Sequence, residues 1–283
     1  MRRSVVVGAV AAALVAAGVT SAVVRPETQP TASSTCYGSY SCPPAVLGYD
    51  LVSSSGTVYT FSNPSYGSIK NPGAPVVGMA VTSSGGYYVT TTKGNVYTRG
   101  GVPWYGSTAG RKLASKVVGI AVAANGGYYL ATDNGTVFAF HAPFYGSRYH
   151  KPLPAPVVGI ATSPKGGYYL VTAKGNVYNF HAPWYGSEAG HTLRYKVVGM
   201  SVASGGGYYL TTTAGNVFSF HATFFGSKAR THLPAPVVGI TVGAKGGYYL
   251  TTSKGNVYNF HATWFGSTAS RRLPSPIVGI AAS

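Results

Sequence analysis

The sequence predicts an all-β fold, a six-bladed β-propeller with four-stranded blades of about 40 residues, and three observations predict it. A Val-Val-Gly segment returns at an almost constant interval. The stretches between these segments have the composition of short strands joined by tight turns. The two ends of the array supply complementary parts of one repeat, so the C-terminal strand is expected to complete the first blade.

Three short segments mark the repeat. The Val-Val-Gly segment recurs with steps of 41, 40, 40, 40 and 40 residues, starting at Val76, Val117, Val157, Val197, Val237 and, as Ile-Val-Gly-Ile, at Ile277. A Gly-Tyr-Tyr segment starts at Gly86, Gly127, Gly167, Gly207 and Gly247, with a degenerate copy at Gly48. A Tyr/Phe-Gly-Ser segment ends at Ser68, Ser107, Ser147, Ser187, Ser227 and Ser267. Self-similarity at this period indicates a repeat architecture.

Each repeat reads as four strands, here taken from the fourth copy. Residues 157–162 are apolar and β-branched, and residues 168–172, Tyr-Tyr-Leu-Val-Thr, follow a Gly-Gly turn. Residues 177–180 follow a Lys-Gly-Asn hairpin, where glycine reaches positive φ without steric cost. Residues 184–187, Trp-Tyr-Gly-Ser, predict a short fourth strand. The first two strands are apolar or aromatic at nearly every position, as expected when both faces of a sheet are covered.

The ends of the array predict how the ring is completed. The first repeat begins with its second strand, near Gly48, and the last repeat stops after a first strand, residues 277–283. We therefore expect the C-terminal strand to pair beside Leu51 and to give six blades. An alternation over about 80 residues, as in Trp104, Phe144 and Trp184, favours an even number of blades.

The N-terminal region predicts export. Arg2 and Arg3 precede an apolar run, and small residues follow at 20–22, as in a signal peptide. Residues 1–24 are equally long enough to remain as a membrane-anchoring helix, so both interpretations stay open. Residues 25–43 form a Pro/Ser/Thr-rich spacer, and residues 44–283 form the propeller. The predicted location is secreted or at the cell surface. Membrane contact is expected only through the N-terminal segment, if that segment is not cleaved.

The spacer contains the two cysteines of the chain, Cys36 and Cys42. A close cysteine pair in an exported protein is most simply a disulfide loop. Metal binding would need two further ligands nearby, and the neighbouring sequence has none.

The repeats resemble the secreted propeller-like repeat proteins of actinobacterial cell envelopes. The matching stretches are Gly127-Tyr128-Tyr129-Leu130, Gly135-Thr136-Val137-Phe138, Phe140-His141-Ala142, Phe144-Tyr145-Gly146-Ser147 and Pro156-Val157-Val158-Gly159-Ile160. The likeness covers about residues 44–283 and implies a propeller in the cell envelope, without specifying an activity. Tyrosine replaces the family's tryptophan in the second strand, and histidine replaces aspartate in the third turn, so a role of that aspartate does not carry over.

The charge is strongly basic, with 21 Lys and Arg against 4 Asp and Glu. Blade topology places the turns between second and third strands at the same end as the crossovers between blades, and fifteen of the eighteen basic residues of the propeller fall there. The candidate binding residues are Arg111, Lys112, Lys116, Arg148, Lys151, Arg194, Lys196, Lys228, Arg230, Arg271 and Arg272. Such a face attracts an anionic envelope polymer or another envelope protein. Export argues against nucleic acid, and a role in solubility alone is the alternative.

One histidine recurs per blade in four blades: His141, His181, His221 and His261. These imidazoles are a weak candidate for a metal-binding or pH-sensitive ring. The simpler interpretation, which we favour, is that each one satisfies backbone groups of its own turn.

The sequence predicts no enzyme and no cofactor. Only Asp50, Asp133 and Glu188 supply carboxylates to the propeller, each in a different repeat, and no Gly-x-Ser-x-Gly elbow occurs. The expected function is a non-catalytic binding module of the cell envelope. A structural or self-assembling envelope protein, forming oligomers through edge strands, is the first alternative, and a hydrolase is the second.

Paired aromatic residues occur near the predicted blade edges: Trp104-Tyr105, Phe144-Tyr145, Trp184-Tyr185, Phe224-Phe225 and Trp264-Phe265. We expect them to pack between blades rather than to form a sugar-stacking surface.

Overall fold

The computed structural model describes residues 48–283, which belong to one compact unit, Ala45–Ser283. The segment 1–24, the spacer 25–43 and the cysteines Cys36 and Cys42 lie outside the described residues. Within the described part, all regular secondary structure is β, with 18 strands. No helix in residues 48–283 is long and apolar enough to cross a membrane.

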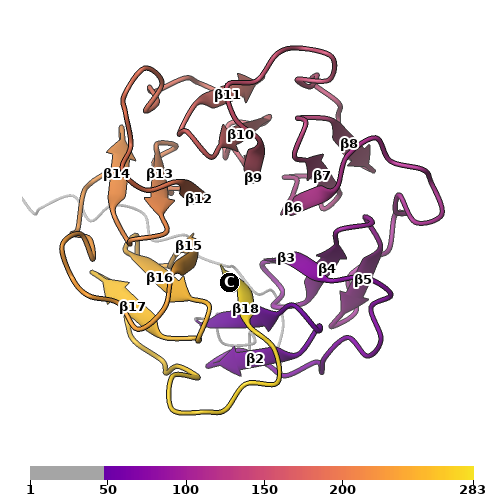
Figure 1. The fold of residues 1–283 in the computed structure, drawn as a ribbon. Helices are drawn as coiled ribbons and strands as arrows, with labels where there is room; N and C mark the ends of the chain where they lie inside the picture. The colour runs from indigo at the N-terminus through magenta and orange to yellow at the C-terminus, as the bar shows by residue number, and fades with distance from the viewer. Residues whose placement is uncertain (1–47) are drawn as a thin grey trace, which may run out of the picture. The chain divides into compact units, whose positions relative to one another are not determined.

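The strands form six antiparallel sheets of three strands each, arranged in a ring (Figure 1). We number the sheets as blades 1 to 6 along the chain. Blade 1 contains β18 (Ile277–Ala282), β1 (Tyr49–Ser53) and β2 (Val58–Phe61). Blades 2 and 3 contain β3 (Val76–Val81), β4 (Tyr87–Thr91), β5 (Val96–Arg99), β6 (Val117–Val122), β7 (Tyr128–Thr132) and β8 (Val137–Phe140).

Blades 4 to 6 repeat the same pattern. They contain β9 (Val157–Thr162), β10 (Tyr168–Thr172), β11 (Val177–Phe180), β12 (Val197–Val202), β13 (Tyr208–Thr212), β14 (Val217–Phe220), β15 (Val237–Val242), β16 (Tyr248–Thr252) and β17 (Val257–Phe260). The first strand of each blade is innermost and contacts the first strands of the two adjacent blades. The fold is therefore a propeller-like ring of six sheets.

The predicted pairing of the C-terminal strand with the first repeat is present. β18 pairs antiparallel with β1, from Tyr49 opposite Ala282 to Ser53 opposite Ile277. β18 also contacts β15 of blade 6 and β3 of blade 2, so the last repeat adjoins the first around the ring.

The prediction of four strands per blade is wrong. Residues 184–187 and their equivalents form no ladder with the third strand. Their backbone is instead bound by the next blade. The Tyr208 hydroxyl accepts a hydrogen bond from Tyr185 N (3.3 Å) and donates one to Gly186 O (2.5 Å). Each Tyr-Gly-Ser segment therefore connects two adjacent blades, and we call it the seam segment.

The core lies between the blades. Every middle strand is buried along its whole length, as in β10 with Tyr168 to Thr172. The tyrosines of adjacent middle strands contact each other, with the ring centroids of Tyr129 and Tyr168 4.5 Å apart. Such an aromatic pair contributes about 0.5–1.5 kcal/mol beyond its burial. Burial on both faces accounts for the nearly continuous apolar sequence of these strands.

Candidate functional site

The hairpins between second and third strands and the crossovers between blades meet at one end of the ring. In blade 4, Ala173 N donates to Pro156 O (2.9 Å), and the first strand of the next blade continues the chain of bonds from Val197 N to Ala173 O (2.9 Å). Glu188 N, which follows the seam segment, donates to Gly175 O of the hairpin (3.0 Å). Gly175 is required there, because its φ is +77° and an added Cβ would lie 2.7 Å from Glu188 Cβ.

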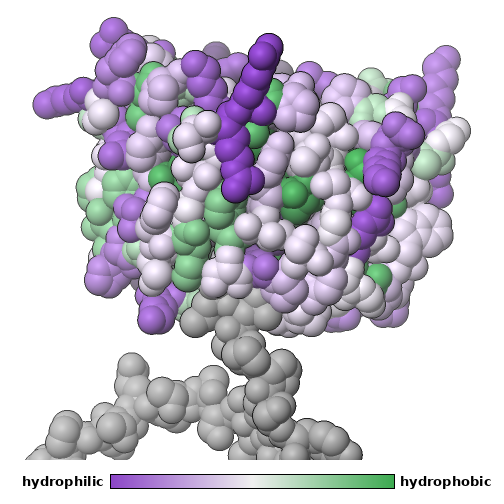
Figure 2. Space-filling view, turned by 90° about the horizontal axis from the view of Figure 1, so that it is seen from below, coloured by the Kyte–Doolittle hydropathy of each residue, from purple (hydrophilic) through white to green (hydrophobic). Residues whose placement is uncertain are grey.

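All eleven predicted binding residues lie in this set of crossovers, which we call the basic face. Nine of them are exposed, and Arg148 and Lys228 are partly buried. Figure 2 shows hydrophilic side chains projecting along one edge of the ring. The opposite end is formed by the turns between first and second strands and the turns after the third strands, and it carries Lys165 and Lys245.

The lysines and arginines of residues 48–283 have no carboxylate partner. The ion pair found in this part of the chain joins His191 Nδ1 to Glu188 Oε2 at 3.0 Å. Asp133 accepts a hydrogen bond from the Ser115 hydroxyl, and Asp50 is fully buried. Among the described residues, the lysines and arginines of the basic face therefore form no ion pairs with carboxylates and outnumber the two carboxylates at the same end of the ring, Asp133 and Glu188.

Two members of the basic face also stabilise the contacts between blades. The Arg148 guanidinium lies over the ring of Tyr178 in the next blade, 4.3 Å from its centroid, and donates to Pro152 O (2.9 Å). Lys228 Nζ likewise lies 4.5 Å from the ring centroid of Tyr258 in the next blade. Tyr258 is the equivalent of Tyr178. These cation–π contacts hold the two side chains against the outer wall of the ring.

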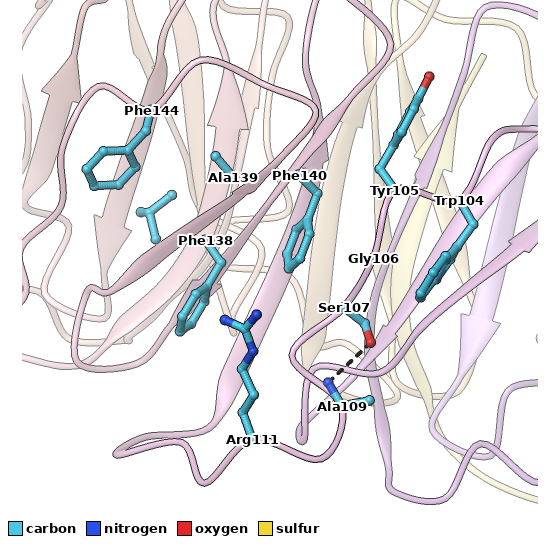
Figure 3. A pocket seen from close by; sticks show the side chains of 11 residues that line it. Trp104, Tyr105, Gly106, Ser107, Ala109, Arg111, Phe138, Ala139, Phe140 and Phe144 are labelled. Atoms are coloured by element: carbon cyan, nitrogen blue, oxygen red, sulfur yellow. Dashed lines mark hydrogen bonds between the residues drawn. The ribbon is translucent and has the colours of Figure 1, made fainter.

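A groove runs along the outer wall between blades 2 and 3, with a volume of about 890 Å³. Its floor is β8, with Phe138 and Phe140, and its two sides are Trp104 and Phe144 (Figure 3). Arg111 from the basic face extends toward Phe138 at one end of the groove. We call this the wall groove.

The aromatic pairs behave differently from the prediction. The second member packs, as in Tyr105, whose ring stacks on His141 of the next blade at 4.3 Å. The first member is exposed, with 60% of Trp104 and 59% of Phe144 accessible to solvent. The equivalent side chains are exposed to a similar extent: Trp184 59%, Phe224 53% and Trp264 56%. One feature of the sequence could have indicated this exposure. The first repeat has Ser65 at the same position, so the position does not require an apolar side chain.

The recurring histidines do not converge. His141, His181, His221 and His261 each occupy a turn with φ between 49° and 51°. Each imidazole stacks on an aromatic ring of the preceding blade, as His181 does on Tyr145 at 4.5 Å. No group of three or more His, Cys, Asp or Glu side chains in residues 48–283 is placed to hold a metal ion. In the described residues these four imidazoles therefore take part in contacts between blades and are not gathered into one cluster.

Blade 1 departs from the repeat at a buried position. Asp50 stands where the other blades have the second tyrosine, as at Tyr88, and neither of its carboxyl oxygens has a hydrogen-bond partner. Burial raises the pKa of Asp50 to about 7. In the adjacent blade, Arg99 stands where other blades have a phenylalanine such as Phe140. Sequence reasoning identified Asp50 as one of the three carboxylates of the propeller, in a degenerate copy of the repeat, and did not predict its burial.

A second depression of about 430 Å³ lies at the end of the ring opposite the basic face, where the innermost strands end. It is lined by small apolar and hydroxyl side chains, including Ala123, Ser163, Ser201 and Val242. None of its lining residues has an ionisable side chain.

No protein-family model matches the chain, and no curated protein matches its sequence. Among solved structures, a protein of unknown function from Bacteroides caccae aligns with a TM-score of 0.54 and 11% identity, over 83% of this chain and 98% of that chain. YCF48 from Cyanidioschyzon merolae aligns with a TM-score of 0.43 and 13% identity, over 71% of each chain. A catalytically inactive virginiamycin B lyase from Staphylococcus aureus, solved with quinupristin, aligns with a TM-score of 0.41 and 14% identity, over 74% of this chain and 73% of that chain. At these identities the likeness concerns the fold alone.

Proposed function

We propose that the chain is an exported, non-catalytic binding module of the cell envelope that holds an anionic envelope polymer through its basic face. The observation that carries the proposal is the gathering of lysines and arginines at one end of the ring without carboxylate partners among residues 48–283. A one-sided field of this kind attracts polyanions and weakens as salt screens it.

The envelope location in this proposal rests on the sequence. Residues 1–24 have the pattern of a signal peptide or anchor, and the repeats resemble those of secreted actinobacterial envelope proteins. An anionic polymer of the envelope is the polyanion that an exported basic ring would meet.

The absence of catalysis in this proposal is supported by the positions of the carboxylates. Asp133 is engaged by Ser115, Glu188 pairs with His191, and Asp50 is buried in blade 1. Acid–base hydrolysis of a glycan generally needs two carboxyl groups that face each other across the substrate. These three groups belong to different blades, which favours binding over hydrolysis.

Chromatography on an immobilised acidic glycan tests the proposal. We expect the protein to be retained at low salt and to elute as salt increases, because exposed charges more than a Debye length apart are largely screened. The double variant R271Q/R272Q should elute at lower salt. The matched control K165Q/K245Q removes the same charge from the opposite end and should elute close to the unmodified protein. Retention that does not depend on salt, or equal shifts for both variants, would contradict the proposal.

A further inference from the structure

We infer that the wall groove is a carbohydrate-binding site, in which Trp104 and Phe144 stack on sugar rings and Arg111 pairs with an acidic group of the same glycan. This inference rests on the proposed function, because it assigns a chemical class to the anionic polymer. It adds a site on the outer wall that meets the basic face at Arg111.

The groove has the form of a ligand site. Its two sides come from successive blades, Trp104 after β5 and Phe144 after β8, and its floor carries Phe138 and Phe140 (Figure 3). Its volume of about 890 Å³ lies within the range of about 300–1,000 Å³ common for small-molecule sites. Exposed apolar surface bordered by polar groups marks an interaction site more often than ordinary surface.

The indole of Trp104 is held in place while its ring remains open to solvent. Its Nε1–H donates to Val96 O at 3.2 Å, so the polar atom is paired within the protein. The side chain is still 60% exposed. Trp104 and Tyr105 point to opposite sides of the seam segment (Figure 3), and Tyr105 makes the contact with His141 of blade 3. Trp104 is thus not needed to join the blades, and a ligand can cover its ring without disturbing them.

A sugar fits this combination of groups. The face of an aromatic ring is apolar and electron-rich, and a pyranose presents a face of weakly positive C–H groups with its hydroxyls around the edge. Arg111 presents a planar set of donors that matches a carboxylate or phosphate group. It is exposed and has no carboxylate partner among the described residues. A purely apolar partner would cover this charge without pairing it, which is unfavourable.

The arrangement recurs around the ring. All three tryptophans of the chain, Trp104, Trp184 and Trp264, occupy the same exposed position, and Phe144 and Phe224 occupy it in the blades between. Blade 1 has Ser65 there. A polymer of repeating sugars can contact several such positions at once, and multivalent contact raises the apparent affinity by about 10²–10⁴.

Tryptophan fluorescence tests the inference at a single site. In the variant W184F/W264F, Trp104 is the only tryptophan, and phenylalanine already occupies the same position in blades 3 and 5. Titration with oligogalacturonate should change the Trp104 emission in a saturable manner. R111A in this background should weaken binding about tenfold, as expected for the loss of one charge-assisted pair. On the long polymer, W104A/W184A/W264A should lose about 10² or more in apparent affinity.

Matched probes separate this inference from the proposed function. Polyglutamate of equal charge should bind the basic face without changing the Trp104 emission. An unchanged emission with oligogalacturonate, while salt-dependent retention on the glycan column persists, would overturn the wall groove and leave the proposed function intact. A larger emission change with oligothymidylate than with oligogalacturonate would assign the groove to nucleic acid. A lower native mass for W104A than for the unmodified protein would assign the groove to self-association. Either result would overturn the inference. Loss of column retention for the unmodified protein would instead overturn the proposed function. Unchanged melting temperatures would show that the variants are folded.

Discussion

At the scale of single residues, Asp50 is the clearest departure from the repeat. The equivalent tyrosine in blade 3, Tyr129, lies against Tyr168 and donates its hydroxyl to Pro143 O at 2.8 Å. Asp50 has neither contact, and it is fully buried near Asn63 and Tyr87. A buried carboxylate without a hydrogen bond is costly, so the protonated form is favoured in the folded state.

The pH dependence of stability follows from this position. The pKa of Asp50 is raised to about 7 in the folded protein, against about 3.9 in the unfolded chain. The contribution of Asp50 to the free energy of unfolding is therefore most favourable below pH 4, declines as pH rises from about 4 to 7, and is lost above pH 7. The total change in the free energy of unfolding is about 4 kcal/mol. We expect denaturant unfolding of wild type to show this decline relative to D50N.

A second substitution gives the prediction a matched control. D50Y introduces the side chain found at this position in the other five blades. We expect it to raise the free energy of unfolding at pH 7.5 and to leave no decline relative to D50N between pH 4 and 7. Parallel stability curves for wild type, D50N and D50Y would contradict the role assigned to Asp50.

At the scale of elements, the seam segment shows where sequence reasoning stops. Trp184 and Tyr185 have strand propensity, and this predicts a fourth strand. Gly186 does not continue it, because its φ is +118° and an added Cβ would lie 2.9 Å from the ring of Phe220 in the next blade. The absence of a fourth strand therefore depends on a contact between two blades, made by residues about 35 positions apart in the chain. The strands within a blade depend on local pattern, and all three per blade were predicted.

The seam segment also gives a testable contribution to stability. The Tyr168 hydroxyl donates to Gly146 O (2.5 Å) and accepts from Tyr145 N (3.3 Å). Y168F leaves both backbone groups without this partner in a partly buried place. We expect it to lower the free energy of unfolding by about 1–3 kcal/mol.

The matched control is Y149F, which removes a tyrosine hydroxyl from an exposed side chain. A surface change of this kind should stay within about 0.5 kcal/mol. Equal effects of Y168F and Y149F in denaturant unfolding would mean that the hydroxyl does not join the blades.

The candidate site was predictable in part for the same reason. Strand order alone determines the end of the ring at which a crossover lies. Topology was therefore enough to place Arg111, Lys151 and Arg194 on the basic face. The exposure of Trp104 and the burial of Tyr105 depend on the path of the seam segment, which the sequence pattern assigned to a strand. The stacking of His141 on Tyr105 is likewise a contact between blades. The sequence of a single repeat does not reveal such a contact.

At the scale of the whole molecule, the ring depends on the C-terminal strand. Ile277 and Ile280 of β18 are buried, and β18 contacts β1, β3 and β15. Deleting residues 277–283 should expose β1 as an edge strand and remove the contact between the first and last repeats. We expect the truncated protein to lose its cooperative thermal transition.

A permuted chain provides the control for this deletion. Ser283 N donates to Gly48 O at 3.3 Å, so a short turn can join the end of β18 to the start of β1 as in the other blades. A chain that begins at residue 277, continues through such a turn to residue 48 and ends at residue 276 should retain cooperative melting. Unchanged melting of the truncated protein would show that β18 is dispensable.

The place of β1 within blade 1 has a mechanical consequence. β1 is the central strand of its sheet, hydrogen-bonded to β18 on one side and to β2 on the other. Tension applied to the chain at Gly48 would act along β1 and would have to shear both sets of backbone bonds together. An outermost strand could instead be pulled away one bond at a time, so the chain enters the ring at the strand best suited to bear load.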